Sequence, residues 1–128
     1  MQPKTKKSIP TDLELEILKV IWQRRAATVR EVFGDLSAKR KIAYTTVLTM
    51  MGVLEHKGHL KKKAGERAYV YRPVVPQDQV VQGMVDEFVN RVFDGSTTPL
   101  LMHLVGGRAI DPEELAEIEK VLQARRDA

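Results

Sequence analysis

Hydroxyl-bearing side chains gather at the start of one predicted helix, in a pattern suited to reading the edges of nucleic-acid bases. Val47, Met51 and Leu54 are spaced i, i+4 and i+7, which predicts a helix over residues 42–57 with these residues inside. A threonine hydroxyl can bond to a base or a phosphate, and its methyl group can contact a thymine methyl. The residues predicted to read bases lie on the first turns: Tyr44, Thr45, Thr46 and Thr49.

Two other roles compete with base reading on this helix. Thr45 and Thr46 could instead cap the helix or simply be exposed, since threonine is common at helix N-termini. Leu48 and Met50 stand beside the apolar face, and we expect both to pack inside with it.

Basic residues flank the predicted helix on both sides. A lysine triplet is usually a solvated face, but several basic clusters around one helix favour contact with phosphates. The residues predicted to contact the DNA backbone are Lys39, Arg40, Lys41, Lys61, Lys62, Lys63 and Arg67.

The charge of the chain is distributed unevenly. Residues 1–75 carry 16 Lys and Arg against 7 Asp and Glu, whereas residues 76–128 carry 5 against 10. A basic half beside an acidic half indicates a polyanion-binding module joined to a second module.

Other chemistries lack the residues they need. The 128 residues include no cysteine, and His56, His59 and His103 have no metal-ligand spacing, so we expect no metal and no cofactor. The serines fall in arms or loops without a base beside them, and we expect no enzyme. No apolar run reaches the roughly 18 residues that span a bilayer, and Met1–Ser8 is not a secretory signal. We therefore expect a cytoplasmic protein without membrane insertion.

Capping signals divide the first half of the chain into short helices. Thr11 with Glu14 and Thr28 with Glu31 form capping boxes that predict helices over 12–24 and 29–36. In the first helix, Trp22 is expected to pack in the core or to plug the edge of the domain. Gly58 suits the left-handed cap at the end of the third helix, over 42–57.

A change to period-two alternation follows these helices. Residues 59–63 and 68–72 are predicted to be strands joined by a tip at 64–67, where Gly65 can take a positive φ. Three helices and a hairpin make a winged helix-turn-helix, in which the third helix enters the major groove. The predicted fold is mainly α with a small β-hairpin.

The last 53 residues predict a helical dimerisation domain, residues 76–128, after a DNA-binding domain at 1–75 whose residues 1–10 form a flexible basic arm. A helix over 77–93 has a broad apolar stripe. A short apolar segment, 99–105, and a helix capped by Asp111 follow. The residues predicted to form the dimer are Val81, Met84, Val85, Phe88, Val89, Val92, Leu115, Ile118 and Leu122.

Five blocks of the chain, in the same order, resemble the penicillinase repressor family of BlaI, MecI and CopY. These blocks are Leu15–Trp22, Ala27–Glu31, Lys41–Thr49, Leu54–Gly58 and Arg67–Pro73. The match is looser beyond them, where Phe88–Gly95 resembles the linker helix of the family. The resemblance implies a homodimeric repressor that binds double-stranded DNA at a roughly palindromic operator, and a β-lactam or stress signal. It also implies a membrane-bound sensor protease as a partner. The cysteine motif of the copper-responsive branch is absent from this chain.

The resemblance also places a candidate cleavage site at His103 and Leu104. Staphylococcal members are cut at an Asn-Phe bond, and this chain keeps the apolar residue but not the asparagine. Whether the chain is a protease substrate therefore stays open.

The alternative function is a winged-helix adaptor that binds protein rather than specific DNA, because winged helices serve both roles. Retention on a heparin or DNA column that salt abolishes would separate the two. An RNA-binding module would need exposed aromatic residues for stacking, and only Tyr44, Tyr69 and Tyr71 are available. We expect a dimeric, sequence-specific transcriptional repressor.

Overall fold

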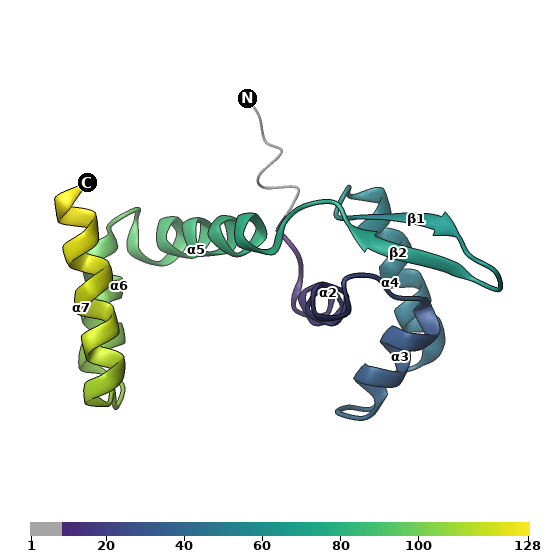
Figure 1. Ribbon diagram of the computed structural model, residues 1–128, viewed down its shortest axis with the longest axis horizontal. Helices are drawn as coiled ribbons and strands as arrows, with labels where there is room; N and C mark the ends of the chain where they lie inside the picture. Colours follow the sequence, from purple (N-terminus) through teal and green to yellow (C-terminus); the bar gives the residue numbers. More distant parts are fainter. Residues whose placement is uncertain (1–8) are drawn as a thin grey trace. The chain divides into compact units, whose positions relative to one another are not determined.

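The computed structural model describes residues 9–128, and these form a mainly helical fold with one antiparallel hairpin (Figure 1). The predicted fold class is confirmed. The predicted basic arm lies outside the described residues, apart from Ile9 and Pro10. The elements are α2 (Asp12–Arg24), α3 (Val29–Ser37), α4 (Tyr44–His56), β1 (Leu60–Ala64), β2 (Tyr69–Pro73), α5 (Gln77–Phe93), α6 (Thr97–Gly106) and α7 (Pro112–Asp127).

Both predicted capping boxes are present. The backbone N–H of Thr11 donates to Glu14 Oε1 at 3.0 Å, and the N–H of Glu14 donates to Thr11 Oγ1 at 3.3 Å. Thr28 and Glu31 exchange the same two bonds at 2.9 and 3.1 Å. These bonds satisfy N–H groups that have no partner within the helix, and so they fix where α2 and α3 begin.

One apolar core of described residues holds α2, α3 and α4 against β1 and β2, and Figure 1 shows the ribbons of these elements gathered together. Trp22 packs against this core, as predicted. The fully or almost fully buried apolar residues are Ile17, Leu18, Ile21, Ala27, Val29, Val32, Leu36, Val47, Met51, Leu54, Leu60 and Tyr71. The inner face predicted for α4 is therefore correct.

The prediction for Leu48 is wrong. Leu48 is 47% exposed, whereas Met50 is partly buried against the core. The reason is helical geometry: Leu48 lies one turn after Tyr44 and one turn before Gly52, and both are on the exposed side of α4.

The end of α4 is closed by a left-handed glycine. Gly58 has φ +91°, its N–H donates to the carbonyl of Glu55 at 3.0 Å, and the N–H of His59 donates to Leu54 at 2.9 Å. These two bonds make a Schellman motif, which turns the chain from α4 into β1.

The hairpin differs in detail from the sequence prediction. Each strand starts one residue later than predicted, with Leu60 paired to Pro73 and Ala64 to Tyr69. Gly65 has no positive φ; its N–H donates to the carbonyl of Ala68, and an added Cβ would lie 2.7 Å from that oxygen. Glycine is needed there for a close backbone approach.

An additional bridge ties the hairpin to the connection between α2 and α3. The N–H of Ala27 donates to the carbonyl of Tyr71 at 3.0 Å, and the N–H of Tyr71 donates to that of Ala27 at 2.8 Å. A single bridging residue has no period, so the sequence pattern did not predict it.

The chain divides into two compact units, one up to Glu87 and one from Phe88 to Ala128. This division falls inside α5. The assignment of residues 1–75 and 76–128 to separate functions stays a prediction. None of the helices in the described part of the chain is long and apolar enough to cross a membrane.

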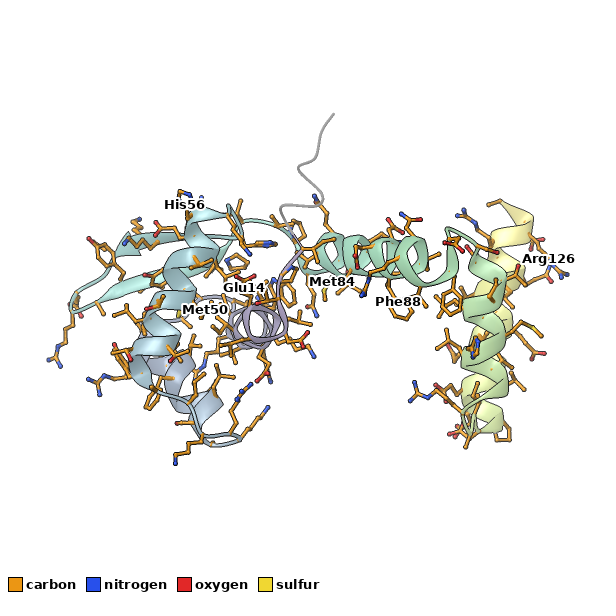
Figure 2. All side chains as sticks on the ribbon, turned by 180° about the vertical axis from the view of Figure 1, so that it is seen from behind. Glu14, Met50, His56, Met84, Phe88 and Arg126 are labelled. Carbon is orange, nitrogen blue, oxygen red and sulfur yellow. The ribbon has the colours of Figure 1, made fainter. Side chains whose placement is uncertain are left out.

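A partly buried ion pair joins the start of α2 to the end of α4. The side chain of Glu14 is only 2% exposed, and Lys57 Nζ lies 3.0 Å from each of its carboxylate oxygens. Figure 2 shows Glu14 on α2, within the winged helix. Because Glu14 also accepts from the N–H of Thr11, its carboxylate links the N-cap of α2 to the end of α4.

We predict that breaking this pair destabilises the winged helix. Lys57→Met leaves a buried carboxylate without its cation and should cost about 3 kcal/mol of unfolding free energy. Glu14→Gln should cost less, because the Lys57 ammonium that it leaves unpaired is 32% exposed. The double variant should lose clearly less than the sum of the two, as denaturant unfolding measures.

The matched control is Glu16→Gln, which removes the exposed ion pair between Arg40 Nη1 and Glu16 Oε2. That change should cost at most about 1 kcal/mol. If the double variant loses as much unfolding free energy as the two single variants together, Glu14 and Lys57 do not act as a pair.

Candidate nucleic-acid interface

The residues predicted to read bases all lie on the solvent side of α4. Tyr44, Thr45, Thr46 and Thr49 are exposed in the first two turns. The N-cap of α4 is Ala43, which has no side chain able to cap. Neither Thr45 nor Thr46 occupies the N-cap, so capping does not explain these threonines.

One contact fixes the start of α4 against α3, and another ties α3 to α2. The ring of Tyr44 meets the ring of Phe33 edge-on, with centroids 5.5 Å apart, and so fixes the start of α4 against α3. Arg24 binds both carboxylate oxygens of Asp35 at 2.9 Å, which ties α2 to α3.

The hydrogen bonds from Arg24 lower the pKa of Asp35 below its usual value. This link therefore contributes its full stability above the pKa of Asp35 in the unfolded chain, and loses it as pH falls through the lowered value.

The hairpin, here called the wing (residues 60–73), separates its three lysines. Lys62 pairs with Tyr71, whose ring is buried, so Lys62 lies on the core-facing side of the wing. Its Nζ is 3.6 Å from Glu55 and 4.4 Å from the centre of the Tyr69 ring. Lys61 and Lys63 lie on the opposite side. The triplet is therefore not one contact surface.

The cluster before α4 is also divided. Lys39 and Lys41 are exposed, but Arg40 forms its ion pair with Glu16 at 2.7 Å. The predicted roles of all seven basic residues stay predictions, and the structure gives Lys62 and Arg40 acidic neighbours that reduce their pull on a phosphate.

A groove with a volume of about 700 Å³ runs between the start of α4 and the wing. Tyr44 and Leu48 line it from α4, and Arg67 and Tyr69 line it from the wing. Burial raises the pKa of Tyr71, which also lines the groove, so this hydroxyl stays neutral in the physiological range. The groove therefore has largely apolar walls and carries the positive charge of Arg67.

Seven of the nine lining residues were not among the predicted site residues, and Arg30, Tyr69 and Leu48 are the three of them that bear most on binding. Arg30 lies in the first turn of α3, where its charge faces the groove rather than the core. Its position in a helix-turn-helix was the sequence signal that could have identified it as a site residue. Tyr69, the first residue of β2, is 52% exposed. Leu48 is apolar, so its residue type gave no indication of a role in binding.

The described residues contain no group of three or more histidine, aspartate or glutamate side chains that could hold a metal ion. The groove itself is lined by no carboxylate. Its chemistry is that of an anion-binding surface with an apolar centre.

Comparison with known proteins decides the family. The family model described as penicillinase repressor matches residues 10–124. The chain belongs to the penicillinase repressor family. It is therefore a DNA-binding transcriptional repressor with a winged helix, and it is not an enzyme.

Relatives in this family match most of the length of the chain. It is 36% identical over 115 residues to the transcriptional regulator BlaI of Mycobacterium tuberculosis, spanning 84% of this chain and 83% of that one. It is 28% identical over 123 residues to the penicillinase repressor of Bacillus licheniformis, spanning 94% and 96%.

Among solved structures, the monomeric form of Bacillus licheniformis BlaI in complex with the blaP half-operator matches with a TM-score of 0.49 and 33% identity. The match spans 55% of this repressor and 85% of that chain.

We predict different effects for phosphate-binding and base-reading residues of this repressor. Arg67→Ala should weaken binding to all duplexes alike and lower the slope of log affinity against log salt by about 0.9. Lys62→Ala should change the slope less, because Glu55 already pairs with this lysine.

Thr49→Ala should instead leave the salt slope unchanged and cost about 1–3 kcal/mol of discrimination between preferred and random duplexes. Fluorescence anisotropy over a range of salt concentrations measures both quantities. An unchanged discrimination for Thr49→Ala and Thr46→Ala would mean that another face of α4 reads the DNA.

Proposed function

We propose that this repressor acts as a homodimer on a roughly palindromic operator, with one winged helix reading each half-site. The observation that carries this proposal is a row of apolar side chains left in solvent along α5. Val81, Val85, Phe88 and Val92, spaced by three or four residues, are each more than 40% exposed. A stripe of this kind marks a contact with another helix.

The other residues predicted to form the dimer fit the same proposal. Met84 and Phe88, one turn apart, lie on the same side of α5 (Figure 2). Leu115 and Leu122 on α7 are exposed, and Met84, Val89 and Ile118 are half-buried. No residue of the predicted set is buried within the chain, so all of them stay accessible to a partner.

Helix α6 adds apolar surface that the sequence analysis did not assign. Neither α6 nor α7 contains a buried residue. Leu101, Met102, Leu104 and Val105 are all exposed on α6. Helices this apolar need a partner surface, and a two-fold dimer is the common solution.

Two-fold symmetry matches the proposed operator. Two half-sites that face the same side of the duplex lie about 34–36 Å apart or a multiple of that distance. Coupling two weak half-site contacts through the dimer raises the affinity for the full operator. A dimer bound there excludes RNA polymerase, and this mode of action places the repressor in the cytoplasm.

We predict that charge in the apolar row separates the dimer. Val85→Lys in the full-length chain should convert the dimer to a monomer at micromolar concentration, as sedimentation velocity measures. Affinity for a full operator should fall by at least tenfold, whereas affinity for one half-site should stay the same.

Val121→Lys is the matched control, because Val121 is 68% exposed on α7 and outside the predicted interface. It should remain dimeric. A wild-type chain that sediments as a monomer at micromolar concentration would contradict the proposal.

The inducing signal acts, in our proposal, on the C-terminal helices rather than on the reading face. The candidate bond between His103 and Leu104 lies inside α6, and the ring of His103 lies 5.7 Å from that of Phe93. A protease needs an extended substrate, so α6 must open locally before cleavage. Separating α7 from α5 would then weaken the dimer. The competing interpretation is induction that leaves the chain intact.

We predict that β-lactam treatment of the bacterium produces a fragment ending at His103, because a membrane-bound sensor protease cuts the opened helix. Mass spectrometry of the repressor recovered from treated cells measures the fragment. Leu104→Asp should block cleavage, because it changes the residue that follows the cut bond. Leu101→Asp is the matched control and should still be cut, since the two leucines are similarly exposed on α6, at 42% and 40%. Intact chains while the target genes are expressed would rule out cleavage as the trigger.

A further inference from the structure

Leu48 is an exposed apolar residue on the side of α4 that carries the threonines. It lies one turn beyond Tyr44 on the exposed side of α4, with Thr45 and Thr49 beside it. Its side chain is 47% exposed and lines the groove between α4 and the wing. The core does not use it, although Val47 and Met51 on the same helix are fully buried.

The residue one turn after Leu48 is Gly52. A glycine in a helix interior costs about 1 kcal/mol of stability relative to alanine. A Cβ added at Gly52 would meet nothing within 4 Å, so packing inside the chain does not explain the glycine. Glycine on an open helix face allows another molecule to approach the backbone closely.

The surroundings of Leu48 indicate a polyanionic partner. Arg30 and Arg67 line the same groove, and no acidic residue does. The partner must therefore present an apolar group between negative charges. In the major groove of DNA, the C5-methyl of thymine is the apolar group at the base edges, and phosphates flank it.

We propose that Leu48 contacts a thymine methyl group in each half-site and so makes one operator position specific for an A·T pair. Gly52 leaves the space that lets α4 come close enough for this contact. The inference rests on the proposed function, since it requires α4 to enter the major groove of a specific operator.

Replacing thymine by deoxyuridine tests the contact, because uracil lacks only the C5-methyl. The probe is the duplex that the full-length wild-type chain selects from a random pool, with single thymines replaced in turn. One replacement should reduce wild-type affinity by about fourfold, the effect of one methyl group leaving an apolar contact. Leu48→Ala should bind the unmodified duplex about as weakly and lose nothing more at that position.

Variants of the neighbouring threonines identify which side chain contacts the methyl. Thr45→Ser and Thr49→Ser each remove a methyl and keep the hydroxyl. Both should retain the fourfold loss with deoxyuridine. If the loss persists in Leu48→Ala and disappears in one of the serine variants, the threonine reads the methyl and the inference is overturned.

Gly52 provides a second measurement that does not depend on removing a side chain. Gly52→Ala should raise the melting temperature by about 4–8 °C, because it favours the helix, and should lower operator affinity at least tenfold. Gly34→Ala is the matched control. Gly34 lies in α3 with equally open surroundings and does not line the groove, so its variant should gain stability and bind normally.

The outcomes separate this inference from the proposed function. A chain that selects no sequence from the pool contradicts the proposed function itself. A chain that selects an operator but shows no deoxyuridine effect linked to Leu48 contradicts only the inference, as does Gly52→Ala with unchanged affinity.

Discussion

The carboxylate of Glu14 holds the winged helix together at the point where its first and third helices meet. It is almost fully buried, closes the capping box of α2 and receives two bonds from Lys57 at the end of α4. A buried charge is tolerated only with such partners. Each partner is therefore held in position, and the direction of α4 follows. The Schellman motif at Gly58 then starts the wing at a defined place beside α4.

Once α4 is fixed, its two faces have different functions. Val47, Met51 and Leu54 fill the core, and the residues on the other side stay exposed, where we propose that they meet DNA. The wing completes this surface because the bridge between Ala27 and Tyr71 anchors β2 to the helices. The same arrangement explains why Lys62 and Arg67 are not equivalent. Strand alternation turns Lys62 toward Glu55, and the hairpin tip leaves Arg67 on the groove.

The sequence predicted the elements well because their signals are local. Two capping boxes, the left-handed Gly58 and the Asp111 cap each involve residues three or four apart, and the structure contains all of them. The features that the sequence analysis missed or predicted wrongly involve residues far apart in the chain, or residues whose side of a helix the pattern does not determine. Leu48 is apolar, and periodicity alone placed it beside the core. The ion pair of Lys57 with Glu14 spans 43 positions, and no short pattern announces it. The groove depends on α3, α4 and β2 together, so Arg30 and Tyr69 were not assigned to it.

The central claim is that the exposed face of α4 and the tip of the wing meet DNA, with two chains on one operator. Backbone amide chemical shifts of the full-length repressor, followed during titration with its selected duplex, test this directly. The account predicts that the largest shifts occur over residues 44–52 and 65–69, and that they saturate at two chains per duplex. Shifts concentrated in α6 and α7 with α4 unchanged, or saturation at one chain per duplex, would contradict it.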